Sequence, residues 1–304
     1  MIKKTAASAI LEQLAIENRR VLSDWRAFLL LRRATFRIPP EARRWAELPR
    51  QIDELYPLLR QMGTRGEIEA LPRLGRIYQV TVPYARTGVV QEDEILMDAN
   101  PYAAVSHWSA LVYHSLTNDL PQELIATTPA SYAGDLLPPG TTTLDWEGLS
   151  PVRGQRPDRI LSWPVRWISV TPERYFGFRE YQPQGYPVRV TTPERTLVDG
   201  LQSPSLCGGF QNVLQAWARA RDTLDLSALV GIVDRFNVGV LRQRVGFILD
   251  QLDLSHPAVE AWQTLAKRGG SSKLFGGEPY APTYSERWSL SINAPIAALS
   301  GNVA

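Results

Sequence analysis

The chain has 304 residues, 44% of them hydrophobic, which is enough for roughly two domains with a sizeable core and excludes wholesale disorder. One cysteine and three histidines exclude an internal disulfide framework and a cysteine-based zinc site, and they argue against a histidine-rich metal site. No apolar run approaches the roughly 18–20 residues of a membrane span, and Glu12, Gln13 and Glu17 interrupt the N-terminal segment, which argues against a signal peptide. These features predict a cytoplasmic protein.

Positive charge is concentrated in the first 90 residues. They hold 16 Lys and Arg against 9 Asp and Glu, a balance of +7, while the remainder holds 17 against 22, a balance of −5. Fourteen of the 16 are arginines, whose planar guanidinium suits phosphate and the guanine edge better than the lysine ammonium does. The asymmetry indicates that one domain meets a polyanion. Charge alone leaves open that these arginines simply lie on solvated helix faces.

Three helices are predicted in succession at the start of the chain. Apolar spacing predicts helices over 5–17, over 24–33, and from Pro49 to just before Gly63. Pro57 is expected to kink the third helix, because it removes a backbone donor and crowds the preceding turn.

A basic hairpin is predicted after the third helix. The segments 67–71 and 77–83 predict two short strands around a turn that contains Gly75 and carries Arg73 and Arg76. Three helices followed by a basic hairpin are the order of a winged helix-turn-helix, whose third helix enters the major groove and whose wing contacts the DNA backbone. The alternative is a small helical subdomain capped by a hairpin. The charge excess and the two arginines favour the DNA-binding hypothesis.

The rest of the chain predicts a mixed domain of helices and strands. Residues 86–99 are interpreted as a linker or the exit from the wing, and 100–118 as a helix. Strands are expected at Glu123–Thr128, Val165–Val170, Val188–Val190 and Ser285–Asn293. Further helices are expected at 193–199, 210–221, 227–236, 238–252 and 257–267. We therefore expect an α+β protein with a winged-helix DNA-binding domain over 1–90 and a larger mixed domain over 91–304.

Residues that could perform catalysis form no recognisable constellation. Ser106, His107 and His114 lie close in sequence, but the chain has no Gly-x-Ser-x-Gly elbow and no carboxylate evidently placed to orient a histidine. We interpret the histidines as buried and bonded to backbone in a helix core. Arg195 and Asp199 are interpreted as a structural ion pair at i,i+4 spacing. No enzymatic activity, metal or cofactor is expected.

Several segments together resemble those of the AbiEi-type antitoxins. Ser106–Thr117 is similar to the family's S-H-x-S-A-L…H-x-L-T segment, and Val190–Gly209 to its E-R-T-L-x-D…G-G segment. Arg242–Leu249 is similar to the R-x-G-x-L-L segment, and Tyr284–Trp288 to the closing R-W. Each motif is soft by itself, while their order is fairly specific, and the resemblance covers about residues 20–295.

The resemblance implies a type IV toxin–antitoxin system, which acts in abortive infection. In this family an N-terminal winged helix binds operator DNA, expected here to carry inverted repeats, and represses its own operon. The C-terminal domain is associated with neutralising a nucleotidyltransferase-like toxin, without a stable complex being required. The resemblance therefore predicts an antitoxin that is also a transcriptional autorepressor.

Six residues are predicted to contact DNA. Those at or before the third helix are Arg43, Arg44, Arg50 and Gln51, and those in the wing are Arg73 and Arg76. Two other hypotheses stay open. One is a nuclease or hydrolase that acts on nucleic acid, and the other is a winged-helix module that docks a protein partner.

Overall fold

A computed structural model describes residues 3–85, 89–131, 136–265 and 272–300. It contains helices and β-sheets in mixed order, which confirms the α+β class. Residue contacts group the chain into two compact units. The first unit holds Met1–Ala104, Thr127–Tyr175 and Glu180–Arg189, and the second holds Val105–Ala126, Phe176–Arg179 and Val190–Ala304. The boundary predicted after residue 90 falls inside the first of these segments.

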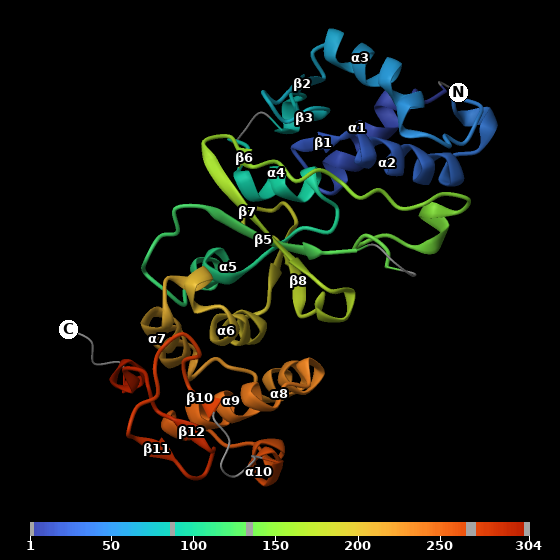
Figure 1. The fold of residues 1–304 in the computed structure, drawn as a ribbon. Coiled ribbons are helices and arrows are strands. Elements are labelled where there is room, and N and C mark those ends of the chain that lie inside the picture. Colours follow the sequence, from blue (N-terminus) through green and yellow to red (C-terminus); the bar gives the residue numbers. More distant parts are fainter. Residues whose placement is uncertain (1–2, 86–88, 132–135, 266–271, 301–304) are drawn as a thin grey trace. The chain divides into compact units, whose positions relative to one another are not determined.

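The first unit begins with three helices and a small antiparallel sheet (Figure 1). The elements in chain order are α1 (Ala6–Ile16), β1 (Val21–Ser23), α2 (Asp24–Arg37), α3 (Tyr56–Thr64), β2 (Ile68–Ala70) and β3 (Ile77–Val80). The strand order is β1-β3-β2, with Leu22 opposite Tyr78 and Ile68 opposite Val80. Ser23 caps α2 by accepting a hydrogen bond from the Arg26 backbone N–H.

The apolar faces of the three helices form one core. Ile10 and Leu14 of α1, Phe28 of α2, and Leu59 and Met62 of α3 belong to it, and each is at most 2% exposed. Their three- and four-residue spacing turns one side of each helix inward. Burial of these side chains stabilises the packing of α1, α2 and α3, by about 1.5–3 kcal/mol for each large one.

Two features of this segment differ from the sequence expectation. The sequence does not predict β1, because its three residues are all buried and too few to show alternation. The third helix is a 3₁₀ turn, Ile52–Leu55, followed by α3, so Pro57 lies in the first turn of α3 and does not kink it. Proline is tolerated there because the first N–H groups of a helix have no partner within it.

The segment interpreted as a linker contains a helix, so that prediction is wrong. α4 (Glu92–Ala99) begins with three acidic residues, which favour a helix N-terminus, and it buries Ile95, Leu96 and Met97. The helix predicted over 100–118 is shorter than expected. Here β4 (Ala104–Val105) precedes α5 (His107–Tyr113), because every residue from 101 to 107 is buried and no helical stripe forms.

Six strands form the largest sheet, in the order β6-β7-β5-β4-β9-β8. The bounds of the five strands not yet given are β5 (Leu124–Pro129), β6 (Arg159–Ile160), β7 (Trp163–Val170), β8 (Phe178–Tyr181) and β9 (Val188–Thr191). β6 and β7 pair antiparallel, and β4 runs parallel to β9 with Val105 opposite Val190. The structure confirms the predicted strands near 123–128, 165–170 and 188–190.

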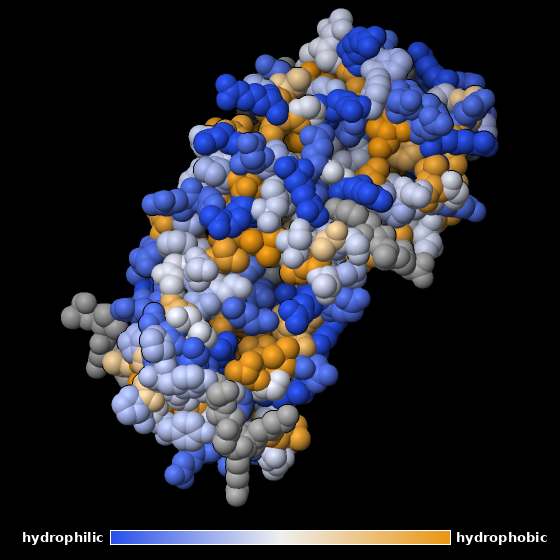
Figure 2. All heavy atoms as spheres, viewed as in Figure 1, coloured by the Kyte–Doolittle hydropathy of each residue, from blue (hydrophilic) through white to orange (hydrophobic). Residues whose placement is uncertain are grey.

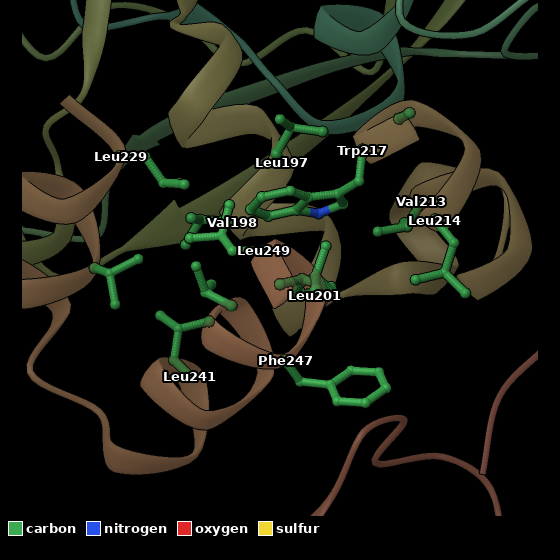
Figure 3. Packing of buried hydrophobic residues seen from close by; sticks show 14 of the residues in the cluster. Leu197, Val198, Leu201, Val213, Leu214, Trp217, Leu229, Leu241, Phe247 and Leu249 are labelled. Atoms are coloured by element: carbon green, nitrogen blue, oxygen red, sulfur yellow. The ribbon is translucent and has the colours of Figure 1, made fainter. Parts of the chain in front are cut away.

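Consecutive helices carry the core of the second unit. They are α6 (Pro193–Gln202), α7 (Phe210–Ala220), α8 (Leu226–Phe236), α9 (Gly239–Gln251) and α10 (Pro257–Leu265). Trp217 of α7 is fully buried and lies close to Leu197 and Val198 of α6 (Figure 3). These helices confirm the sequence prediction, except that residues 266 and 267 of the last predicted helix lie outside the described residues.

A second three-stranded sheet follows, in the order β10-β12-β11. Its strands are β10 (Ser272–Lys273), β11 (Tyr284–Ser285) and β12 (Leu290–Ser291). The single strand predicted over Ser285–Asn293 is therefore wrong. Ser289 takes a left-handed φ of 52° and Trp288 turns into the core at 1% exposure, so the chain reverses between β11 and β12.

Short 3₁₀ helices also lie in the described part of the chain. They are η1 (Pro40–Ala42), η2 (Ile52–Leu55), η3 (Pro83–Ala85), η4 (Thr143–Trp146), η5 (Pro172–Arg174), η6 (Pro204–Cys207) and η7 (Ile296–Ser300). None of the helices in the described ranges combines the length and the hydrophobicity that crossing a bilayer requires.

Candidate nucleic-acid interface

The third helix has a buried face and a polar face. Leu59 and Met62 are 1% and 0% exposed and anchor α3 in the core. Arg60, Gln61 and Thr64 are exposed, and their spacing places them along the opposite side of the helix. The visible surface around α3 and the neighbouring helices is mostly hydrophilic (Figure 2). Arginine and glutamine are side chains that can donate to base edges in a major groove.

The turn between β2 and β3 is tight and projects an arginine. The Leu71 backbone N–H donates to the Ile77 carbonyl at 2.9 Å, and Leu74 is 3% exposed, which fixes the turn to the core. Arg73 takes a left-handed φ of 66° and is exposed. A left-handed backbone at a non-glycine residue costs roughly 1–2 kcal/mol. The anchored turn therefore holds Arg73 in a conformation that is uncommon for this residue in a free chain.

Arg76 contacts other residues of the fold and is also half-exposed to solvent. Its Nε lies 3.4 Å from Asp24 Oδ2, its guanidinium lies 4.7 Å from the centre of the Tyr56 ring, and its side chain is 52% exposed. Burial raises the pKa of Asp24, although the Arg76 charge acts to lower it. Arg76 and Arg60 line the same groove, about 440 Å³ in volume, between α3 and the hairpin.

The structure separates the four residues predicted at or before the third helix. Arg44, Arg50 and Gln51 are exposed. Arg43 is 9% exposed, its guanidinium lies 5.6 Å from the centre of the Trp45 ring, and its Nε and Nη1 are buried without an acceptor among the described residues. A phosphate contact needs a donor that solvent can reach, so two of the three guanidinium nitrogens of Arg43 cannot make one, in contrast to its exposed neighbour Arg44.

A carboxylate occupies the start of the third helical segment. Glu54 accepts hydrogen bonds from the backbone N–H groups of Gln51, at 3.1 Å, and Arg50, at 3.3 Å. Free N–H groups at a helix start attract phosphate, and the two N–H groups just before the Ile52–Leu55 turn already have an anionic partner. The backbone of Gln51 is therefore not a phosphate site, and any contact of this residue with DNA has to come from its side chain.

Arginines of α2 hold the first unit together. Arg26 Nε donates to both carboxylate oxygens of Asp98, at 2.8 and 2.9 Å, and Arg33 pairs with Asp145. Arg32 is 1% exposed and donates to three backbone carbonyls. Both carboxylate partners lie beyond residue 90. The positive charge counted in the first 90 residues therefore overstates the charge that this segment can offer to a polyanion.

Sequence reasoning missed the exposed polar residues of α3. The sequence predicted that the third helix begins at Pro49, so the expected DNA contacts were placed near residues 43–51. In the structure α3 begins at Tyr56, and those residues precede it. The signal that could have identified Arg60, Gln61 and Thr64 is their spacing, because these residues alternate with the apolar residues of the same segment. Arg65, the C-cap residue of α3, is exposed too.

The polar residues of the second unit are tied into its interior. His107 is 5% exposed with Nδ1 2.9 Å from Ser106 Oγ, and burial lowers the pKa of His107. Arg195 Nε donates to both carboxylate oxygens of Asp199 at 2.9 Å, so the expected ion pair is present, and it is buried. Nowhere in the described ranges do three His, Cys, Asp or Glu side chains gather as metal ligands would.

Comparisons with known proteins find a similar solved structure but no matching sequence family. The chain matches no protein-family model, and no curated protein is significantly similar to it. It is similar to the crystal structure of the RV2827C protein from Mycobacterium tuberculosis, with 14% sequence identity and a TM-score of 0.49. The match covers 97% of this chain and 93% of that chain.

Proposed function

We propose that the segment from α1 to β3 is a winged helix-turn-helix domain that binds duplex DNA. The element order α1-β1-α2-α3-β2-β3 and the antiparallel sheet β1-β3-β2 support this assignment. The observation that carries the proposal is the exposed polar face of α3, which lies beside a groove that it shares with the hairpin.

In the proposed complex α3 enters the major groove. Arg60 and Gln61 then donate to base edges, since Arg suits guanine and Gln suits adenine. Arg73, at the turn of the wing, contacts phosphate. Arg44, Arg50 and Arg65 are further exposed guanidinium groups that can neutralise phosphates around the helix.

We further propose that the DNA is an operator of the protein's own operon and that the protein is the antitoxin of a type IV system. The resemblance of the segments around His107, Arg195, Arg244 and Trp288 to AbiEi-type antitoxins supports this role. Its partner is then a nucleotidyltransferase-like toxin. Growth of cells that express such a toxin from the neighbouring reading frame tests the role: co-expression of this chain restores growth if the proposal holds.

DNA binding is tested by fluorescence anisotropy with a duplex from the upstream region and a shuffled duplex of equal length. Gln61→Ala is expected to weaken binding to the upstream duplex by about tenfold and to leave the shuffled duplex unaffected, because a base contact contributes about 1–3 kcal/mol of discrimination. Arg73→Glu is expected to weaken binding to both duplexes and to reduce the salt slope by about 0.9 for each phosphate that the variant no longer neutralises.

Arg221→Glu is the matched control. Arg221 is an exposed arginine of the second unit whose 3.7 Å pair with Asp253 is solvent-exposed, so its reversal changes the net charge as much as Arg73→Glu does. Equal effects of Arg73→Glu and Arg221→Glu would contradict the proposed wing. Failure of the native protein to bind either duplex at moderate salt would favour a protein-docking module, and Mg²⁺-dependent degradation of the duplex would favour a nuclease.

A further inference from the structure

A pocket of about 380 Å³ lies within the first unit. This volume is in the lower part of the range of small-molecule sites, roughly 300–1,000 Å³. Its walls come from α1, α2, α4 and the segments 139–141 and 180–189. Four arginines line it: Arg19, Arg26, Arg33 and Arg189. None of the residues proposed to contact DNA lines this pocket.

Arg26 has donors that the protein does not use. The residue is only 7% exposed, and its guanidinium lies 4.4 Å from the centre of the Trp25 ring. Its Nε donates to Asp98, whereas within the described ranges neither Nη1 nor Nη2 reaches an acceptor. Neither Nη atom is buried from solvent, so both open into the pocket, where a ligand that supplies an acceptor can replace the solvent.

The charges around the pocket favour an anion. Burial lowers the pKa of Arg26, and the Arg19 charge lowers it further, while Asp98 raises it. Two guanidinium groups therefore repel one another in a partly enclosed space. Two carboxylates line the pocket: Glu17, which pairs with Arg19 at 2.7 Å, and the exposed Glu180. Asp98, the partner of Arg26, is not part of the lining. A ligand with two negative charges would relieve the repulsion between Arg19 and Arg26.

The other two arginines have structural roles. Arg33 pairs with Asp145 at 2.8 Å. Arg189 Nη1 donates to the backbone carbonyls of Pro101 and Ala103, at 3.0 and 2.9 Å. They add positive charge to the wall and hold it rigid. Arg26 is also paired, with Asp98, but only through Nε, so its two Nη groups remain for a ligand, and the charge of Arg19 acts on the same space.

We propose that this pocket binds a phosphate monoester attached to a planar body, the chemical class of a mononucleotide. The phosphate accepts hydrogen bonds from Arg26 and Arg19, whose paired positive charges match a dianion better than a single carboxylate. The planar body lies against the apolar wall that includes Leu29, Met97 and Pro101. This binding does not depend on whether the protein binds DNA.

Calorimetric titration of the full chain with adenosine 5′-monophosphate tests the proposal, with adenosine and inorganic phosphate as probes of the two halves. The monophosphate is expected to bind with a Kd of about 1 mM or tighter, and each half at least about tenfold more weakly. Arg19→Gln is expected to weaken binding of the monophosphate by about tenfold. Glu17→Gln is expected to strengthen it by about fivefold, because a carboxylate that competes for Arg19 is removed.

Glu12→Gln is the matched control, because it removes the same charge from α1, the helix that Glu17 caps, at a residue outside the pocket. Arg221→Gln serves the same purpose for the arginine variant. Equal affinity for adenosine and its monophosphate, or no binding of the monophosphate, would overturn the proposal. So would equal affinities of the Glu17→Gln and Glu12→Gln variants. Loss of monophosphate binding by Arg73→Glu would place the ligand on the proposed DNA surface and would overturn the proposal too.

Discussion

Replacing Asp98 with alanine removes a carboxylate that three donors of the first unit share. Asp98 is 1% exposed and accepts from the Ser23 backbone N–H at 3.0 Å, from Ser23 Oγ at 2.9 Å and from Arg26 Nε at 2.8 Å. The alanine variant therefore leaves a buried guanidinium without its counter-charge. It also loosens Ser23, the residue that caps α2.

The expected loss of stability follows from the burial of both partners. The side chains of Arg26 and Asp98 are 9% and 1% exposed, so solvent screens their interaction weakly. Removing one partner of such a pair costs about 3–5 kcal/mol. At roughly 2–4 °C per kcal/mol for a unit of this size, Tm should fall by roughly 6–20 °C. The Lys4–Glu12 pair of the same unit, 44% and 46% exposed, contributes at most about 1 kcal/mol.

Thermal unfolding followed by circular dichroism compares Asp98→Ala with Glu12→Ala. A double variant, Arg26→Met with Asp98→Leu, should recover part of the loss, because it replaces an unpaired buried charge with apolar packing of similar volume. If Asp98→Ala lowers Tm no more than Glu12→Ala does, the Arg26–Asp98 pair does not stabilise the first unit, and the reasoning fails.

Two further predictions concern the first unit's boundary and the pH response of the second unit. A fragment of residues 1–90 lacks Asp98 and Asp145, the partners of Arg26 and Arg33, so it should show no cooperative thermal transition; a transition near that of the full chain would contradict this. Burial lowers the pKa of His107, so the unfolded chain binds this proton more readily, and stability should fall as pH drops below about 6.5, by up to about 1.4 kcal/mol per pH unit. His107→Gln should reduce this slope in urea-unfolding midpoints measured across that range, and an unchanged slope would refute the assignment.

The sequence predicts the helices better than it predicts their ends. The amphipathic stripes of α7, α8 and α9 place these helices within a residue or two, because packing needs the same spacing that the sequence displays. The short β1 and β4 were missed, since two or three fully buried residues show neither helical nor alternating spacing. α4 was missed because its three leading acidic residues resemble a polar linker, whereas they favour the start of a helix.

In the candidate site, the sequence predicts the position of an arginine better than it predicts whether that arginine is exposed. The position of Arg73 in a hairpin turn was predicted because a turn is defined by neighbouring residues, and the structure leaves this residue exposed; its contact with DNA stays a prediction. Arg43 looks the same in the sequence as its neighbour Arg44, yet one is buried beside Trp45 and the other is exposed. The difference comes from tertiary contacts that residue spacing does not encode.

The number of exposed arginines limits how strongly DNA binding can depend on salt concentration. If all 16 basic residues of the first 90 contacted phosphate, the salt dependence of binding would have a log–log slope of about −14 per chain. Buried or paired residues such as Arg26, Arg32 and Arg43 cannot contribute to it. Lys3, Lys4 and Arg37 are exposed but are not part of the proposed interface. The six exposed candidates in that interface are Arg44, Arg50, Arg60, Arg65, Arg73 and Arg76, and they allow a slope of at most about −5 per chain. A steeper measured slope per chain would require phosphate contacts outside α3 and the hairpin, and the proposed interface would then be too small.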